Sequence, residues 1–195
     1  MKEKVIVTGG MGDLGQELVK ELNKTYSVLV VDSLIKRNQS ELLEDVQLST
    51  FDISSKEWPA LLRSQIKNTK YLFHLAGLTN SAESIKFPYH YHNSNVTGTM
   101  NLLSAATDGN IDKFIFASCI FSNGLYADPF HAQKAMGEMY CKMFHRVYGL
   151  NTLSVRIPKS KSQKTLKKIS QFLIECAEDD SLDSGSRIKY KNGDS

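Results

Sequence analysis

The stretch Val5-Ile6-Val7-Thr8-Gly9-Gly10-Met11-Gly12-Asp13-Leu14-Gly15 decides the fold of this chain. It opens with three β-branched apolar residues, as expected of a buried parallel strand. The glycines at positions 9, 12 and 15 have the spacing G-x-x-G-x-x-G, and apolar residues then recur with a helical period through residues 12–23. Such a turn between a strand and a helix lets backbone amides approach a pyrophosphate at the positive end of the helix. The stretch therefore predicts a dinucleotide-binding turn.

An acidic residue supports this interpretation. A second buried strand, residues 28–31, stops at Asp32. A carboxylate at this place can accept the ribose hydroxyls of NAD and repel the 2′-phosphate of NADP. The alternative is that the glycines only make a tight turn and Asp32 caps a surface strand. Arg37 could in principle favour NADP, but an arginine in an ordinary loop is the simpler interpretation, so we predict NAD as the cofactor.

Strands and helices alternate along the rest of the chain. Further strands are expected at residues 46–51, 71–75, 114–117, 153–157 and 187–190, and helices at 58–66, 81–106, 130–148 and 164–177. Parallel strands need crossover connections, so this alternation predicts a parallel sheet covered by helices on both faces. The fold class is thus α/β, a Rossmann-type doubly wound sheet. Residues 192–195 have the composition of a turn.

The composition is that of one globular domain. The chain has 195 residues, of which 41% are hydrophobic and 23% charged. The net charge of +3 comes from 24 basic and 21 acidic residues, with several lysines between positions 159 and 168. Such a run is typical of a solvated helix face, so we expect no nucleic acid partner.

Targeting signals and metal motifs are lacking. The cysteines Cys119, Cys141 and Cys176 have no metal-ligand spacing, and their odd number fits a reducing compartment. No run of ~18 apolar residues could span a membrane. The first strand begins by about Lys4, which leaves no room for a signal peptide. We expect a cytoplasmic protein with no membrane partner.

Seven short segments carry a more specific pattern: residues 7–12, 31–32, 51–53, 73–77, 95–99, 114–118 and 155–156. The order and the residue patterns of these segments resemble those of the extended short-chain dehydrogenase/reductase family, in particular the NAD-dependent nucleotide-sugar epimerase/dehydratase group typified by UDP-glucose 4-epimerase. The resemblance covers residues 3–158 well. It implies domains at 1–158 (NAD-binding Rossmann domain) and 159–195 (short remnant of the substrate-binding lobe), and a fold with a truncated C-terminal substrate lobe.

The resemblance also implies a set of cofactor-binding residues. Asp52 and Ile53 would flank the adenine, and Asn95 would stabilise the active-site helix and its water. The remaining positions are Gly9, Gly12, Asp13, Leu14, Gly15, Asp32, Leu75, Ala76, Gly77, Lys134 and Pro158. His74 is interpreted as a buried ring, not a ligand. The family further implies a nucleotide sugar as substrate and a homodimer formed by the helices near residues 93–106 and 130–148.

The catalytic positions depart from the family's pattern. That chemistry uses a Ser or Thr, a Tyr and a Lys, and one helical turn places the Tyr phenol near the Lys ammonium, which lowers the phenol pKa. The matching lysine is Lys134, but Phe130 stands four residues before it and has no proton to transfer. Cys119 stands at the hydroxyl position, where a thiol donates weakly, although a nearby lysine could make it more reactive. Ser118 should point to the other side of the strand. Lys134 and Cys119 are therefore the remaining catalytic candidates.

No other residue clearly replaces the missing catalytic and substrate-binding groups. Tyr126, Tyr89 and Tyr91 could substitute for the missing tyrosine, but each is more simply an ordinary packed or surface residue. Ile120 and Phe121 stand where the dehydratase subgroup has an acidic pair, which disfavours 4,6-dehydration. After Pro158 only a short segment precedes the next helix, and Lys159 replaces the family's substrate-binding Asn.

Two functions remain open. One is an NAD-dependent epimerase-like oxidoreductase with a substitute acid/base, and the other is an NAD(H)-binding protein with weakened or lost catalysis. Removal of a general base costs about 10²- to 10⁴-fold in rate. Because two of three catalytic groups are changed, we favour the second function. A third alternative, that the chain is part of a longer protein, also stays open.

Overall fold

The computed structural model describes residues 2–34, 42–43, 45–55, 63–121, 127–182 and 184–191. Within these residues seven parallel strands form one sheet in the order β3-β2-β1-β4-β5-β6-β7. The strands are β1 (Lys4–Thr8), β2 (Ser27–Asp32), β3 (Gln47–Thr50), β4 (Thr69–His74), β5 (Lys113–Cys119), β6 (Thr152–Ile157) and β7 (Ser186–Lys189). The order reverses between β1 and β4, and ligands of such sheets bind beyond the carboxyl ends of the strands at this point. The predicted fold class is confirmed.

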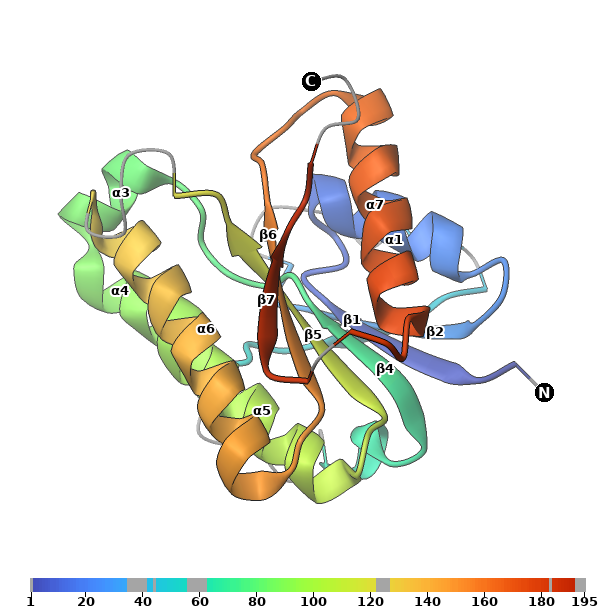
Figure 1. Cartoon of the computed structure of the whole chain (residues 1–195). Helices are drawn as coiled ribbons and strands as arrows, with labels where there is room; N and C mark the ends of the chain where they lie inside the picture. Colours follow the sequence, from blue (N-terminus) through green and yellow to red (C-terminus); the bar gives the residue numbers. More distant parts are fainter. Residues whose placement is uncertain are drawn as a thin grey trace.

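Helices cover both faces of the sheet (Figure 1). One face carries α1 (Asp13–Leu22) and α7 (Gln163–Glu178), and the other carries α3 (Ser81–Lys86), α4 (Pro88–His92), α5 (Gly98–Gly109) and α6 (Pro129–Tyr148). Each face has its own apolar core: Val5, Val7 and Val30 point to the first, and Ile6, Leu29 and Val31 point to the second. This alternation along β1 and β2 explains why both strands read as continuous apolar runs.

The helical segment expected at residues 81–106 is interrupted. Asn80 caps α3 by accepting a hydrogen bond from the Glu83 amide (3.2 Å), and α3 ends at Phe87, whose φ of −129° and ψ of 57° are not helical. Phe87 precedes Pro88, and a proline disfavours the helical conformation of the residue before it. A π-helical segment, Asn93–Thr97, then joins α4 to α5. Most of the helix expected at 58–66, and the turn expected at 192–195, lie outside the described residues.

The segment after Pro158 adds a helix and a strand to the same sheet. α7 packs on α1, and its Ile169 and Leu173 belong to the core cluster that contains Val7 and Leu18. β7 pairs in parallel with β6. Tyr26 also donates a hydrogen bond to Glu178 at the end of α7 (2.6 Å). The separate status of residues 159–195 as a remnant of a substrate lobe stays a prediction.

We expect Leu173→Ala to lower the free energy of unfolding by about 2–5 kcal/mol, because it removes a fully buried side chain and leaves a cavity. Chemical denaturation followed by circular dichroism should show a single transition moved to lower denaturant. Lys167→Ala, on the exposed side of the same helix, is the control and should change stability by less than about 0.5 kcal/mol. Equal stability of the Leu173→Ala protein would show that α7 is not part of the cooperative unit.

Candidate functional site

The glycine-rich turn is packed so tightly that side chains are excluded. Gly9 has a φ of +71°, and a Cβ atom there would lie 2.6 Å from the backbone nitrogen of Ala76. A Cβ at Gly15 would lie 2.2 Å from the carbonyl oxygen of Gly9. Gly12 is exposed at the start of α1, and among the described residues no side chain forms a cap hydrogen bond with this helix. Within the described part of the chain, an anion such as a pyrophosphate can therefore approach the amino end of α1.

Asp32 lies beside this turn at the carboxyl end of β2. Its Oδ2 accepts a hydrogen bond from the Met11 amide (3.0 Å), and its Oδ1 accepts one from the Leu34 amide (2.9 Å). Asp13 and Leu14 form the first turn of α1, where Asp13 is exposed and Leu14 half-buried. The carboxylate of Asp32 is thus held next to the place where a ribose would follow the pyrophosphate.

Asp52 and Ile53 follow β3, next to β2. The Oδ1 atom of Asp52 accepts hydrogen bonds from the amide and hydroxyl of Ser54, both at 2.8 Å. Ile53 is buried against Gly98, where a Cβ would lie 2.7 Å from its Cδ1 atom. The pair therefore forms an apolar and polar wall at this edge of the sheet, which suits an adenine.

The loop after β4, residues 75–77, is tied to the helices by Asn95. Gly77 has a φ of +143°, and a Cβ there would lie 2.6 Å from Asn95 Oδ1. Asn95 Oδ1 accepts a hydrogen bond from the Leu78 amide (2.8 Å), and its Nδ2 donates to the Leu78 carbonyl (3.0 Å) and to Gln133 Oε1 (3.1 Å). Asn95 thus connects this loop to α6, and its role in stabilising an active-site helix stays a prediction.

His74 is fully buried, as expected, and links three elements. Thr99 Oγ1 donates to the backbone carbonyl of Asn95 (2.6 Å), so it accepts from His74 Nε2 (2.8 Å). His74 Nδ1 then accepts from Thr8 Oγ1 (2.8 Å). Burial, assisted by the charge of Lys134, lowers the pKa of His74 well below its usual value. The neutral ring therefore joins the end of β1 to the start of α5.

Lys134 and Cys119 lie near one another at the end of β5. Lys134 Nζ donates to the Ala117 carbonyl (2.7 Å) and lies 4.7 Å from the centroid of the Phe116 ring. Burial lowers the pKa of Lys134 to about 8. Burial raises the pKa of Cys119 to about 11, although the charge of Lys134 opposes this. Cys119 is therefore a protonated thiol at neutral pH, and the neighbouring lysine does not activate it.

The tyrosines considered as substitutes are placed differently. Tyr91 is fully buried and donates a hydrogen bond to Glu83 Oε2 (2.7 Å), and burial followed by this hydrogen bond raises its pKa to about 12. Tyr89 is 85% exposed. Tyr126 lies outside the described residues. Ser118 donates to Glu138 Oε1 (2.6 Å), a residue of α6, the helix that also carries Lys134. The expected opposite orientation of Ser118 and Cys119 stays a prediction.

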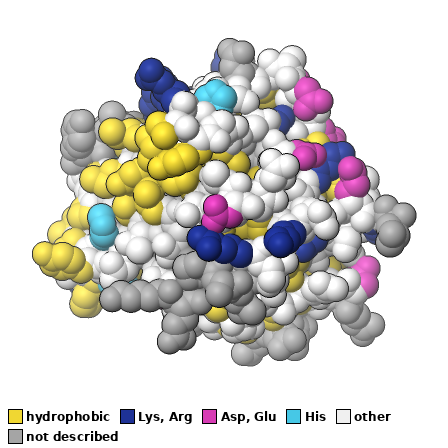
Figure 2. All heavy atoms as spheres, turned by 90° about the horizontal axis from the view of Figure 1, so that it is seen from below, with side chains coloured by type: hydrophobic (Ala, Val, Ile, Leu, Met, Phe, Trp, Pro, Cys, Tyr) yellow, Lys and Arg dark blue, Asp and Glu magenta, His cyan; other side chains and the backbone are white. Residues whose placement is uncertain are grey.

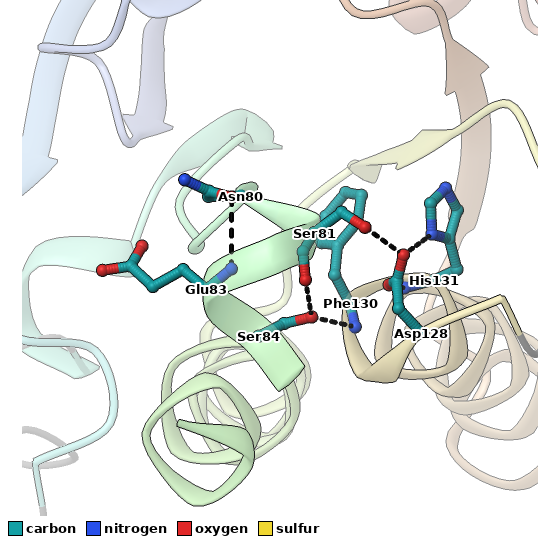
Figure 3. A network of polar contacts seen from close by, with 7 residues as sticks. All are labelled: Asn80, Ser81, Glu83, Ser84, Asp128, Phe130 and His131. Carbon is teal, nitrogen blue, oxygen red and sulfur yellow. Dashed lines mark hydrogen bonds and ion pairs between the residues drawn. The ribbon is translucent and has the colours of Figure 1, made fainter. Parts of the chain in front are cut away.

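A network of polar contacts surrounds Phe130 at the start of α6 (Figure 3). The Phe130 amide donates to Ser84 Oγ (3.2 Å). Asp128 is the N-cap of α6: its Oδ1 accepts from the His131 amide (2.9 Å), while its Oδ2 contacts His131 Nδ1 (2.8 Å) and accepts from the hydroxyl of Ser81. This pair was not predicted from the sequence. An Asp directly before a Pro, with a His three residues later, was the available signal of a helix start.

The other parts of the site are simpler. Pro158 is half-buried and directly follows β6, and Lys159 beyond it is exposed. Among the described residues, His, Cys, Asp and Glu side chains form no group able to hold a metal ion. None of the helices in the described ranges has the length and apolar character needed to cross a membrane.

Comparison with known proteins places these features in a family. The chain is similar to the putative UDP-glucose 4-epimerase of Methanocaldococcus jannaschii, with 26% identity over 97% of this chain and 66% of that protein. It is 36% identical to the UDP-glucose 4-epimerase of Drosophila melanogaster, over 64% of this chain and 39% of that protein. The chain thus spans two thirds or less of the length of these relatives.

Solved structures show the same fold. The UDP-N-acetylglucosamine 4-epimerase of Methanobrevibacter ruminantium M1 superposes with a TM-score of 0.83 and 24% identity, over 97% of this chain and 77% of that chain. The UDP-glucose 4-epimerase of Thermotoga maritima has a TM-score of 0.71 and 28% identity, over 79% and 55%. The profile of one family, described as the NAD dependent epimerase/dehydratase family, matches residues 5–194. The chain therefore belongs to the NAD dependent epimerase/dehydratase family.

Proposed function

We propose that the chain binds NAD(H) and a nucleotide sugar in the manner of the family's epimerases, and that it has lost the tyrosine-dependent catalytic route. The observation that carries this proposal is the contrast between an intact glycine-rich turn and a phenylalanine, Phe130, at the position of the family's tyrosine. The family's name supports NAD as the cofactor. The Bordetella bronchiseptica protein WbmF, which shares the fold, is described in complexes with NAD⁺, with NADH, and with NAD⁺ and UDP.

The geometry of the turn and its neighbours fits NAD. Gly9 and Gly15 are packed tightly and have no side chain that projects from the turn, so a pyrophosphate can reach the backbone amides at the start of α1. Asp32 would hold the adenosine ribose, and Asp52 with Ile53 would flank the adenine. Residues 75–77 and Lys134 would line the nicotinamide side. When bound, NAD supplies the acceptor and donor of hydride for oxidation and reduction of a sugar hydroxyl.

The proton-transfer side of the site is weak. Phe130 is 8% exposed and has no ionisable group, and Cys119 is a protonated thiol that donates a poor hydrogen bond. Lys134 already donates to the Ala117 carbonyl. In the family the lysine acts beside a tyrosine, and here the residue one helical turn before Lys134 is Phe130, which has no phenol. These changes support loss of ordinary epimerase activity, and the alternative is an active enzyme with a substitute acid/base.

We further propose a homodimer formed by the helices of residues 93–106 and 130–148. The helices on this face expose large apolar side chains: Ile85, Phe87, Tyr89, Met136, Met139, Val147 and Tyr148. Figure 2 shows hydrophobic side chains gathered on the left of the view, the side on which α4 and α6 lie in Figure 1. Exposed apolar patches of this kind mark interaction surfaces, and methionines are adaptable contact residues. The alternative is that these side chains only cover the sheet.

The cytoplasm is the proposed location. Cys119, Cys141 and Cys176 are all free thiols, and Cys141 and Cys176 are buried. Thiols persist in reducing compartments, which supports this location.

The chain should bind NAD⁺ more tightly than NADP⁺ in calorimetric titrations, because Asp32 repels a 2′-phosphate. Asp32→Asn should weaken NAD⁺ binding about tenfold, since a hydrogen bond to a charged group contributes about 1.5 kcal/mol. Asp112→Asn is a matched control, because Asp112 is exposed and precedes the amino end of β5, whereas Asp32 lies at the carboxyl end of β2. Tighter binding of NADP⁺, or no binding of either cofactor, would contradict the proposal.

Purified protein should show little turnover of UDP-glucose or UDP-galactose, at least about 100-fold below a tyrosine-containing relative. Phe130→Tyr alone should not restore full activity, because the Cys119 thiol still hydrogen-bonds poorly to the substrate oxygen. The double variant with Cys119→Ser should be faster than either single variant. The assay follows the epimer ratio and the cofactor absorbance, with Phe87→Tyr as the control. Robust turnover by the unmodified chain would refute the proposed loss.

Light scattering at micromolar concentration should give the mass of a dimer. Met139 is 69% exposed on α6, and Met139→Lys should shift the protein to a monomer because it places a charge in an apolar interface. Lys167→Glu changes a charge on the opposite layer of the fold and should leave the mass unchanged. A monomeric parent protein would count against the dimer.

A further inference from the structure

His131 directly follows Phe130, the residue at the position of the family's tyrosine. Its ring centroid is 5.0 Å from that of Phe130, which occupies the tyrosine position, and 6.1 Å from that of Phe121, which follows the end of β5. Its side chain is 13% exposed. The imidazole therefore lies beside two aromatic rings and is mostly buried, and part of its side chain stays exposed.

Asp128 holds this ring in one orientation. Burial alone would raise the pKa of Asp128, but hydrogen bonds from Ser81 and from the amide and ring of His131 lower it below its ordinary value. The carboxylate is therefore ionised and can only accept hydrogen bonds. The proton of its 2.8 Å contact with His131 must then be on Nδ1 of the imidazole. In the neutral ring Nε2 then has a free lone pair. Figure 3 shows this second nitrogen directed away from Asp128.

The arrangement exceeds what a helix cap requires. Asp128 Oδ1 alone satisfies the cap by accepting from the His131 amide (2.9 Å). The second oxygen is used for the imidazole and for Ser81, which belongs to α3. A carboxylate that fixes the tautomer of a histidine, with the other ring nitrogen left available, is the arrangement of a general acid/base pair.

We propose that His131 is the proton acceptor and donor of this site, in place of the missing tyrosine, and that Asp128 is its positioning residue. The inference rests on the proposed binding of NAD. When bound, NAD⁺ would accept the C–H hydrogen of a sugar carbinol with its electron pair and become NADH. His131 Nε2 would take the proton as the O–H bond breaks, so that the sugar carbon becomes a carbonyl and the imidazole an imidazolium. The reverse step returns the proton to the oxygen, so protons and electrons balance.

Competing groups in the described part of the site are less suited to this step. The Cys119 thiol is protonated, and Tyr91 is buried and already donates to Glu83. Lys134 lies within hydrogen-bond distance of the Ala117 carbonyl. His131 is the neighbour of Phe130 in the chain and bears both an oriented ring and an accessible nitrogen.

The test uses the full chain loaded with NAD⁺. This protein is mixed with UDP-glucose or UDP-N-acetylglucosamine, with the protein in excess over the sugar. Cofactor reduction at 340 nm in a single turnover detects slow chemistry that steady-state assays miss. The variants are His131→Gln and Asp128→Asn, and the second retains a good N-cap residue. His92→Gln, an exposed histidine of α4, is the matched control. Thermal unfolding and calorimetric binding of NAD⁺ and UDP establish that each variant folds and binds.

We expect the parent protein to reduce the cofactor slowly with at least one of the two sugars, and His131→Gln to lower the rate about 100-fold or more with NAD⁺ affinity unchanged. His92→Gln should keep the parent rate. An unchanged rate in His131→Gln, or no reduction by the parent although NAD⁺ and UDP bind, would overturn the inference. Failure of NAD⁺ to bind at all would instead overturn the proposed function.

A second readout separates orientation from general structure. Nitrogen-15 NMR of the neutral ring of His131 should show the proton on Nδ1 in the parent protein, both without and with NAD⁺. Asp128→Asn should give a mixture of the two tautomers and a slower single turnover, while the melting temperature stays close to that of the parent. The Nε2–H tautomer in the parent protein would refute the role of Asp128 and leave Nε2 unable to accept a proton.

Discussion

The close approach of the Gly9 backbone to the backbone of Ala76 is the constraint on which this site depends. A Cβ atom at Gly9 would lie 2.6 Å from the Ala76 nitrogen, so the turn after β1 can rest on the end of β4 only with glycine in place. This contact lies where the strand order reverses. It brings the amino end of α1 and the loop after β4 next to one another. The geometry of the proposed cofactor site is thus a consequence of backbone packing.

The two halves of the site are joined through buried hydrogen bonds. Thr8, directly before the turn, bonds to His74, and His74 bonds to Thr99. The Thr99 hydroxyl donates to the backbone carbonyl of Asn95. The side-chain amide of Asn95 in turn donates a hydrogen bond to Gln133 on α6. The path therefore runs from the glycine-rich turn to α6, the helix that carries Phe130 and the proposed catalytic residue Lys134. Replacement of a tyrosine by Phe130 leaves all these contacts intact, so the scaffold can persist when the chemistry changes.

The sheet and the turn could be predicted because their signals are local. Buried parallel strands read as apolar runs, and the glycine spacing places a known turn between a strand and a helix. The Asp128 and His131 pair escaped prediction because its meaning depends on Ser81, 47 residues earlier in the chain. The break at Phe87 was missed because the helical period continues across Pro88. The Asp128 network depends on a contact between distant elements, whereas the break at Phe87 follows from the local effect of Pro88 on the residue before it.

The π-helical segment Asn93–Thr97 makes the site sensitive to chain length. A π-helical turn contains an extra residue compared with an α-helical turn, and each residue of an α-helix turns by about 100°. Loss of one residue within α4 or the π segment would convert the turn to ordinary helix and rotate everything before the deletion relative to α5. Asn95 could then no longer bond both Gln133 and the loop after β4 while Thr99 bonds His74. Substitutions in this stretch should therefore be tolerated more readily during evolution than deletions.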